Sequence, residues 1–275
     1  MMDELKGIVR RARDKRPMVH AITNNVTVND CANIILAAYG APTMAQDPRE
    51  VEEITALCDA LVLNLGAWGA QQAMLLAGKR ANALGHPIVL DPVAAGASFL
   101  RGETSRKLLH SLDIAVLRGN ASEIRALAVG SETTQGVEAN ALDYITEDNL
   151  AASAAMVQDL SRRTGAAVVV SGAIDLVADG VRAVALRGGS AMMRRITGAG
   201  CMLTSLTAVY CGGSPGQPFA AAVAAAAVMN ACAQIAEARV QAQGEGTASF
   251  RTRLIDAVSL FDENQLDRYL QLQVL

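Results

Sequence analysis

Short apolar runs alternate with longer amphipathic segments along most of this chain. The short runs are apolar at every position, as in Ala60–Leu63 and Ala167–Val170, which is typical of strands buried on both faces of a sheet. We therefore expect strands at Met18–Ile22, Ala60–Asn64, Pro87–Leu90, Ile114–Arg118, Ala167–Ser171, Leu176–Ala178 and Ala183–Leu186. The last two form a hairpin whose turn is Asp179-Gly180.

The longer segments predict helices between these strands. They lie at Val28–Tyr39, Pro48–Cys58, Ala70–Leu84, Ser122–Ala128 and Asp148–Arg163. Gly40, Gly85 and Gly165 each follow one of these segments, where a glycine commonly ends a helix in the left-handed conformation. After Cys201 the pattern predicts helices to the end of the chain.

Alternation of strands and helices predicts an α/β protein with a predominantly parallel central sheet flanked by helices in three layers. The chain has no proline- or serine-rich linker and no repeat. We therefore expect one domain over residues 1–275, with an all-helical C-terminal part and no separate lid domain.

Composition excludes several classes of function. The chain is 51% hydrophobic with a net charge of −3, which argues against nucleic acid or an anionic membrane as a partner. The apolar segment Phe219–Met229 is mostly alanine and is interrupted by Asn230, so it predicts a buried helix and not a membrane span. The five cysteines are scattered and have no CxxC spacing, as expected for a reduced, cytoplasmic protein.

Polar residues follow most of the expected strands. Because ligands bind beyond the carboxyl ends of parallel strands, these residues are expected at one edge of the sheet. They are Thr23-Asn24-Asn25, Asn64-Leu65-Gly66, Asp91-Pro92-Val93, the segment from Arg118 to Glu123, and Ser171-Gly172. Several such strand ends together indicate an active site.

The turn Gly198–Cys201 opens directly into a helical pattern. Its free backbone amides and the positive end of the helix dipole predict a site for phosphate or a developing oxyanion. Cys201 is the one polar side chain at the mouth of this turn. Read alone, the turn is equally compatible with an ordinary glycine-rich loop.

The remaining chemistry favours phosphoryl transfer. The sequence contains no GxxxxGK[ST] loop, GxGxxG fingerprint, HExxH motif or metal-type Cys/His cluster. Asp91 and Glu123 are suited to a hydrated magnesium ion, and Arg118 to a phosphate. Each also has a simpler interpretation, because Glu123 could complete a capping box with Asn120, Arg118 could pair with a carboxylate, and Asp91 could form a turn. His20 lies inside an apolar strand and is interpreted as structural.

Together these residues resemble a known family. Gly198-Ala199-Gly200 followed by one functional residue, with Asn120-x-x-Glu123 upstream, resembles the ribokinase-like superfamily, where that residue is normally an aspartate. With Cys201 in its place, the chain resembles the hydroxyethylthiazole kinases of thiamine salvage. The other blocks that carry the resemblance are Ile22–Asn24, Pro42–Ala45, Leu63–Gly66, Leu90–Val93 and Arg118–Glu123.

The resemblance implies ATP- and magnesium-dependent phosphorylation of the side-chain hydroxyl of 4-methyl-5-(2-hydroxyethyl)thiazole. It also implies a homotrimer with its sites between subunits. The matching site residues are Met44, Gly198 and Asn25 for the substrate, Arg118 and Ser171 for ATP, Ala199 and Gly200 for phosphate, Asp91 and Glu123 for the metal, and Cys201 beside the reacting hydroxyl. Ser171 stands where threonine is common, which keeps the hydroxyl group.

The role of Cys201 and the identity of the substrate leave alternatives. A free thiol is a poor strong base, so we expect Cys201 to orient the substrate hydroxyl, and a loose transition state needs little base assistance. Met44 is compatible with a contact to the thiazole ring or with plain core packing. The competing functions are a kinase for hydroxymethylpyrimidine or pyridoxal, a nucleotide-dependent hydro-lyase on the same fold, and a non-catalytic thiazole- or nucleotide-binding protein.

Overall fold

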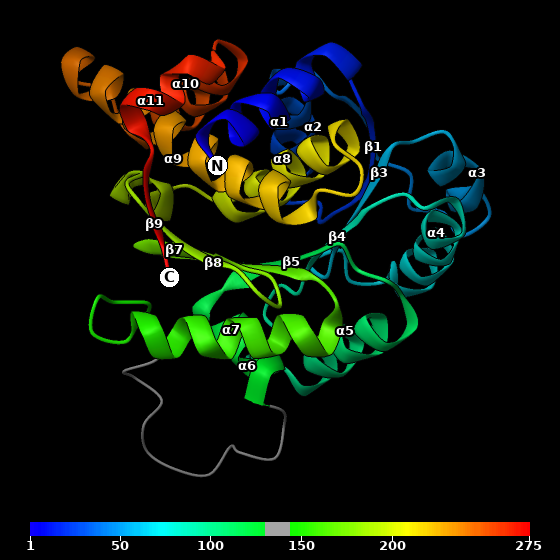
Figure 1. The fold of residues 1–275 in the computed structure, drawn as a ribbon. Helices are drawn as coiled ribbons and strands as arrows, with labels where there is room; N and C mark the ends of the chain where they lie inside the picture. The colour runs from blue at the N-terminus through cyan, green and yellow to red at the C-terminus, as the bar shows by residue number, and fades with distance from the viewer. Residues whose placement is uncertain (130–143) are drawn as a thin grey trace.

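The computed structural model describes residues 1–129 and 144–275. Within them, nine strands form one sheet in the order β2-β1-β3-β4-β5-β6-β7-β8-β9 (Figure 1). In this order, the six strands from β2 to β6 run parallel to one another. Strands β7, β8 and β9 follow, and each pairs antiparallel with the strand before it. The strands are β1 Met18–Ile22, β2 Ala41–Thr43, β3 Ala60–Asn64, β4 Ile88–Asp91, β5 Val116–Asn120, β6 Ala167–Ser171, β7 Ile174–Ala178, β8 Ala183–Arg187 and β9 Gln271–Val274.

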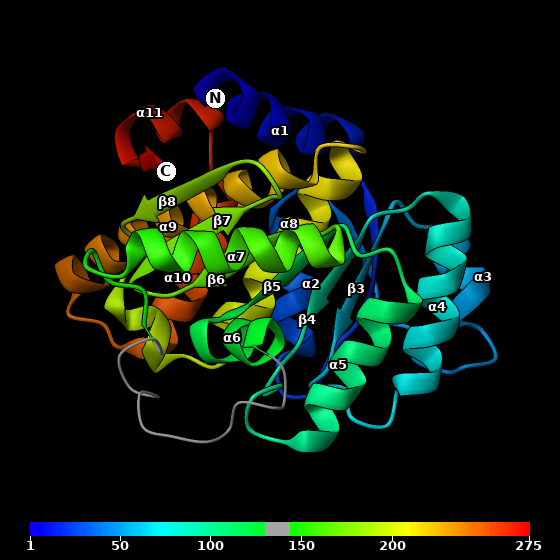
Figure 2. The ribbon, with the colours of Figure 1, turned by 60° about the horizontal axis from the view of Figure 1, so that its bottom comes forward.

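Helices cover both faces of the sheet and make a three-layer molecule (Figures 1 and 2). On one face lie α1 Met2–Lys15, α2 Val28–Ala37, α8 Ala199–Gly213, α9 Pro218–Gln243, α10 Thr247–Ser259 and α11 Leu266–Tyr269. On the other lie α4 Gln71–Leu84, α5 Phe99–Ser111, α6 Ala121–Val129 and α7 Leu150–Thr164, with α3 Val51–Ala56 packed beside α4. The predicted α/β class and predominantly parallel sheet are confirmed.

Alternation along the strands divides the apolar core into two. On β3, Ala60 and Val62 face the layer of α8 and α9, whereas Leu61 and Leu63 face the layer of α4 and α5. Because both faces are covered, every residue of β3 is buried. This explains why the central strands read as continuous apolar runs in the sequence.

Several predicted elements agree with the structure to the residue. Strands β1, β3 and β6 have the predicted bounds, and β7 and β8 form the predicted hairpin. Gly85 and Gly165 end their helices with φ values of 71° and 74°. The prediction for Gly40 is wrong: α2 ends at Ala37, the positive φ falls on Tyr39, and Gly40 instead lies where a Cβ would be 3.1 Å from the Pro17 carbonyl oxygen.

The predicted all-helical C-terminal part is also wrong in one element. Residues Gln271–Val274 form β9, which pairs antiparallel with β8 at the edge of the sheet. This four-residue strand has largely exposed side chains, so the sequence contains no apolar run there that would predict a strand. Its structure depends on the backbone groups of β8, which lie far away in the sequence.

The long helix α9 runs through Asn230 without interruption. By length and composition α9 is apolar enough to cross a membrane, but 89% of its apolar window is buried within the molecule. It packs against α8, α10, β6 and β7 and is therefore a core helix. This helix and α8 bring two polar positions, Asn230 and Cys201, toward the carboxyl edge of the sheet.

Candidate active site

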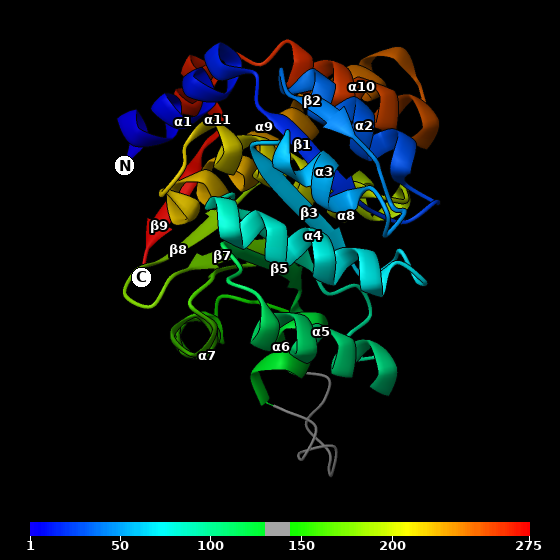
Figure 3. The same ribbon diagram turned by 90° about the vertical axis from the view of Figure 1, so that its right-hand side faces the viewer.

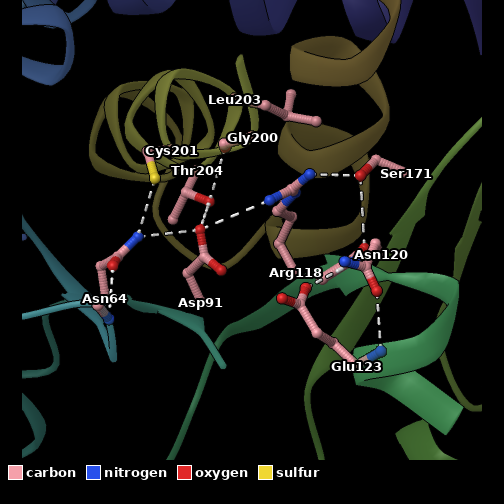
Figure 4. A network of polar contacts seen from close by, with 12 residues as sticks. Asn64, Asp91, Arg118, Asn120, Glu123, Ser171, Gly200, Cys201, Leu203 and Thr204 are labelled. Carbon is pink, nitrogen blue, oxygen red and sulfur yellow. Dashed lines mark hydrogen bonds and ion pairs between the residues drawn. The ribbon is translucent and has the colours of Figure 1, made fainter. Parts of the chain in front are cut away.

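The carboxyl ends of four neighbouring strands bring polar residues together. Asn64 at the end of β3 lies in register with Asp91 at the end of β4, and Asn120 of β5 is in register with Ser171 of β6. The N-terminus of α8 lies against the same edge, because α8 packs on β1, β3 and β4. Figure 4 shows these side chains converging on one point.

Arg118 is the charged centre of this network. Its guanidinium lies 3.5 Å from Asp91, donates to the Ser171 hydroxyl and is only 7% exposed. A Cβ on Gly200 would lie 2.5 Å from Arg118 Nη1, so only glycine lets the first turn of α8 approach the guanidinium this closely. Positive charge and the free amides of a helix N-terminus therefore meet at one position, which favours an anion.

Asp91 is a buried carboxylate that the protein leaves partly unsatisfied. Its Oδ2 accepts hydrogen bonds from Asn64 at 3.1 Å and Thr204 at 2.8 Å, while its Oδ1 is buried without a partner in the described chain. Burial raises the pKa of Asp91 to about 7 against the opposing effect of Arg118. An unpaired carboxylate oxygen at this depth is suited to a hard cation, whose charge would hold the group ionised.

Of the two roles that the sequence left open for Glu123, metal ligand and capping-box residue, the structure shows the capping box. Asn120 and Glu123 form reciprocal 2.9 Å side-chain to backbone hydrogen bonds, which is the predicted capping box at the start of α6. The other carboxylate oxygen accepts from the Ala94 amide at 2.8 Å, so Glu123 also ties the loop after Asp91 to α6. Ala94 has a φ of 61°, and this tie holds that strained residue in place.

No larger metal-binding cluster is present in residues 1–129 and 144–275, where no three His, Cys, Asp or Glu side chains group together. Magnesium does not need one, because it keeps several waters and uses one or two carboxylates with substrate phosphates. The orphaned Oδ1 of Asp91 and the neighbouring Glu123 therefore fit this ion by their chemistry.

Cys201 lies in the first turn of α8, after Gly198 in the left-handed conformation at φ 86°. The side-chain amides of Asn24 and Asn64 donate to its sulfur at 3.5 and 3.3 Å. Hydrogen bonds from Cys31 first, and then from Thr27 and the two amides, lower the pKa of Cys201 against the effect of burial. The resulting thiolate character makes the sulfur a hydrogen-bond acceptor that faces the ends of β1 and β3.

A cavity of about 700 Å³ begins at Arg118, Ser171 and Gly200 and extends beneath the ends of β7 and β8. Asp175, Gly189, Met193, Met229 and Asn230 also line it. The cavity is large enough for a nucleotide. Cys201 does not line it, so the Gly198–Cys201 turn separates the cavity from the side of the site where Cys201 lies.

Two of the predicted substrate residues, Met44 and Asn25, lie toward the β2 edge of the sheet. Met44 follows the edge strand β2, which lies beside α2 (Figure 3), and is half-buried against the core on that face. Asn25 follows β1 and is exposed. Buried His20 contacts the Ala45 carbonyl oxygen at 2.9 Å and so fixes the segment beside Met44, a structural role as the sequence suggested.

Four residues of the site were given no individual role in the sequence analysis. Asn64 links Asp91 to Cys201, and Thr204 lies one turn after Gly200 and donates to Asp91. Asp175 and Asn230 contact each other in the lining of the cavity. Asn64 had a visible signal as a strand-end residue, and Asn230 as the amide inside an alanine-rich helix.

Comparisons with known proteins agree with this geometry. A model of the "Hydroxyethylthiazole kinase family" matches residues 9–264. A protein from Desulfovibrio desulfuricans named hydroxyethylthiazole kinase is 47% identical over 95% of both chains. The solved structure of a hydroxyethylthiazole kinase protein from Pyrococcus horikoshii OT3 superposes with a TM-score of 0.85, at 32% identity and 98% coverage of each chain.

The same fold also occurs in proteins of much lower sequence identity. A ribokinase-like superfamily protein from Enterococcus faecalis V583 superposes with a TM-score of 0.63 over 98% of this chain and 95% of that chain. Its 11% identity carries the fold alone and confirms the predicted ribokinase-like architecture. Because the family model and the closely similar relatives each span nearly the whole sequence, this chain belongs to the hydroxyethylthiazole kinase family.

Proposed function

We propose that this protein transfers the γ-phosphoryl group of ATP to the side-chain hydroxyl of 4-methyl-5-(2-hydroxyethyl)thiazole. One observation carries the proposal: the Gly198–Cys201 turn has two sides. Ala199 and Gly200 face the large cavity beside Arg118, while the Cys201 sulfur faces the Asn24 and Asn64 amides. A phosphoryl donor in the cavity and an alcohol beside Cys201 would meet at the free amides of this turn.

The phosphate end supplies what phosphoryl transfer requires. Arg118 and Ser171 bind the phosphates of the nucleotide, and the amides of Ala199 and Gly200 stabilise the charge that develops on the transferring group. Asp91 and Glu123 would hold magnesium, which would neutralise negative charge on the phosphates. The residues lie in a buried, low-dielectric edge of the sheet, where such electrostatic contributions are strongest.

Cys201 positions the acceptor alcohol. Its lowered pKa makes the sulfur an acceptor for the substrate hydroxyl, which orients the oxygen toward the phosphate. Asn24 and Asn64 hold the sulfur in place, and Met44, Gly198 and Asn25 contact the heteroaromatic ring and its substituents. Cys201→Asp should keep or raise turnover where proton removal contributes to the rate, and a folded but inactive Asp variant would contradict this role.

We also propose a cytoplasmic homotrimer whose substrate site is completed by a neighbouring subunit. The support is the open substrate side of the molecule, where Val26 is 75% exposed and Trp68 is 50% exposed, both just after strand ends. Large exposed apolar side chains beside a site are suited to an interface. The five cysteines are all free thiols, as in a reducing compartment. Light scattering measures the oligomer directly.

The decisive experiment offers several alcohols to the purified protein. MgATP is incubated with the thiazole alcohol, hydroxymethylpyrimidine or pyridoxal, and the products are identified by mass. Phosphorylated thiazole as the main product supports the proposal. Product from another alcohol alone keeps phosphoryl transfer but contradicts the substrate, and a folded sample without any product favours the binding-protein alternative.

A further inference from the structure

A second cysteine lies beside Cys201, and the proposed transfer reaction assigns it no step. Cys31 lies near the start of α2, and Cys201 lies in the first turn of α8. The two helices pack against each other, and the Cys31 thiol donates a hydrogen bond to the Cys201 sulfur. Two cysteines that are far apart in the sequence therefore meet on the substrate side of the site.

A shared set of polar contacts holds the two thiols together. Cys31 Sγ lies 3.9 Å from Thr27 Oγ1, one turn earlier along the chain. Thr27 donates to the Asn24 side chain through its amide and its hydroxyl, each at 3.1 Å, and Asn24 in turn donates to Cys201 Sγ at 3.5 Å. Gly198 allows this close packing, because a Cβ there would lie 2.8 Å from Thr27 Cγ2. The pairing of the two thiols is therefore fixed by the packing of α2 on α8.

The two thiols differ in exposure and in pKa. Cys201 is partly exposed, whereas Cys31 is fully buried. The hydrogen bond between them is the main cause that lowers the pKa of Cys201 and also the main cause that raises the pKa of Cys31. An accessible thiolate is the form of cysteine that a peroxide oxidises, and a neighbouring thiol converts the oxidised product into a disulfide. The pair therefore contains one reactive sulfur and one sulfur placed to resolve it.

We propose that Cys201 and Cys31 form a reversible disulfide when the protein meets hydrogen peroxide, and that this disulfide stops the transfer reaction. The Cys201 thiolate attacks one peroxide oxygen, the O–O bond breaks, and hydroxide leaves and takes a proton from solvent, which gives a sulfenic acid at Cys201. The Cys31 sulfur then attacks the Cys201 sulfur, the S–O bond breaks, and the leaving hydroxide takes the Cys31 proton to form water. The pair of thiols is thereby oxidised to a disulfide, and hydrogen peroxide is reduced to water.

Oxidation of Cys201 also removes the main cause that holds the proton on Cys31. The hydrogen bond to the Cys201 thiolate and the charge of that thiolate both raise the pKa of Cys31. A sulfenic acid carries no such charge, so the pKa of Cys31 falls part of the way while burial still raises it, and its sulfur becomes a better nucleophile.

The disulfide removes the acceptor that the alcohol needs. A disulfide sulfur is neutral, and the bond to Cys31 turns it toward α2. The Cys201 sulfur can then no longer accept the substrate hydroxyl as a thiolate does. This loss of activity rests on the proposed kinase function, whereas formation of the disulfide does not.

Peroxide treatment followed by peptide mapping tests the disulfide directly. The reduced full-length protein is treated with hydrogen peroxide at neutral pH, its remaining thiols are alkylated under denaturing conditions, and a non-reducing digest is analysed by mass spectrometry. Two peptides joined through Cys31 and Cys201 are expected as the main product. Cys58, Cys211 and Cys232 are buried with raised pKa values, so they should be recovered as alkylated thiols.

The same samples report on activity. The rate of thiazole phosphorylation with MgATP should fall in proportion to the joined fraction. Dithiothreitol should reduce the disulfide and restore the rate that the protein had before peroxide treatment. The thiazole alcohol, added before peroxide, should slow the oxidation because it occupies the space beside the Cys201 sulfur.

Cys31→Ser removes the resolving sulfur and keeps a small polar side chain. In this variant peroxide should leave Cys201 as a sulfenic acid, which dimedone traps, and then as a sulfinic acid, which dithiothreitol does not reduce. Cys58→Ser is the matched control, because the buried Cys58 thiol donates to the Ile54 carbonyl oxygen at 3.2 Å in another part of the fold. It should form the disulfide and recover as the natural protein does. Circular dichroism melts compare the folding of both variants before treatment.

The outcomes separate this inference from the proposed function. Joined Cys31 and Cys201 peptides in a folded protein without kinase activity would support the disulfide and contradict the proposed function alone. Sulfinic acid at Cys201 with Cys31 recovered as a free thiol would overturn the inference even in an active kinase. A joined protein that keeps its full activity would overturn it as well, and so would equal recovery by Cys31→Ser and the natural protein.

Discussion

The two ends of the site differ in how completely one chain builds them. At the phosphate end, Arg118 and Asp91 are 7% and 1% exposed and contact each other, with Ser171 and Gly200 closing around them. At the substrate end, Asn25 is exposed and Val26 is 75% exposed. The first end is enclosed by four strand ends and a helix N-terminus, whereas the second lies at the edge strand of the sheet.

This difference indicates that the two ends carry out different parts of the reaction. Charge stabilisation depends on fixed groups in a water-poor setting, so it is built within the rigid centre of the fold. Recognition of a small, neutral heteroaromatic alcohol depends on apolar contact, which a second subunit can supply. Substitutions at the phosphate end should therefore reduce kcat strongly, and those at the substrate end should chiefly raise the KM for the thiazole.

The largest effect is expected from Gly200→Ala. Its new methyl group would lie 2.5 Å from Arg118 Nη1, so the guanidinium must move away from the amides of the α8 turn. A displacement on the order of 1 Å at a reacting group lowers turnover by about 100-fold. Steady-state kinetics with both substrates measure the loss, which should appear in kcat.

Gly246→Ala is the matched control for that substitution. Gly246 precedes α10, has a φ of −109°, and a Cβ there would meet nothing within 4 Å. Its activity should equal that of the natural protein. Equal activity in Gly200→Ala would show that the close approach of Arg118 to this turn has no part in the reaction. It would also contradict the assignment of charge stabilisation to the enclosed end.

Glu123→Gln should have the next largest effect. A glutamine has one oxygen and one NH₂ group, so it cannot accept from both the Ala94 and Asn120 amides as Glu123 does. Loss of its charge and of this tie should raise the magnesium concentration needed for half-maximal rate by about 10- to 100-fold. The KM for the thiazole should change little. Magnesium titrations identical to those of the natural protein would remove Glu123 from the metal site.

The same contrast explains what the sequence could predict. Gly200, Cys201 and Asp91 were identifiable because glycine turns, strand-end carboxylates and a helix start are local patterns. The structure brings them together at the edge where parallel strands must place them. Local patterns therefore predicted most of the fold and the grouping of these residues at one edge of the sheet.

Contacts between distant segments could not be read in this way. Thr204 donates to Asp91 from more than a hundred positions away, and Asp175 meets Asn230 across two elements. Strand β9 exists only because β8 offers an edge to it. Each of these depends on which surfaces pack together, and a single residue in a helical or apolar pattern carries no signal of its partner.

At the substrate end, Met44→Ala should raise the KM for the thiazole roughly tenfold while kcat and the KM for ATP stay unchanged. The thioether lies after the edge strand β2, away from the phosphate network. Met18→Ala is the matched control, because Met18 is partly exposed at the opposite, amino end of β1 and should affect neither constant. A fall in kcat alone would break the proposed separation between binding at one end and chemistry at the other.

Cys201 lies between the two ends. Its titration is the prediction with the smallest expected effect, and it tests the state of the sulfur directly. The hydrogen bonds from Cys31 and the asparagine amides lower its pKa, so the thiolate persists at pH values below the ordinary thiol range of about 8.5. Alkylation by iodoacetamide, followed by mass spectrometry, should therefore stay rapid as the pH falls from about 8.5 toward neutrality. Cys211 and Cys232 are buried and their pKa values are raised, so they should remain unmodified and serve as internal controls.

In Asn64→Ala the pH profile of Cys201 alkylation should move toward higher pH, because one donor to the sulfur is gone. A Cys201 profile centred on an ordinary thiol pKa would mean that the sulfur meets the alcohol as a neutral thiol, and that the amides of the α8 turn act on the phosphate without help from the substrate side.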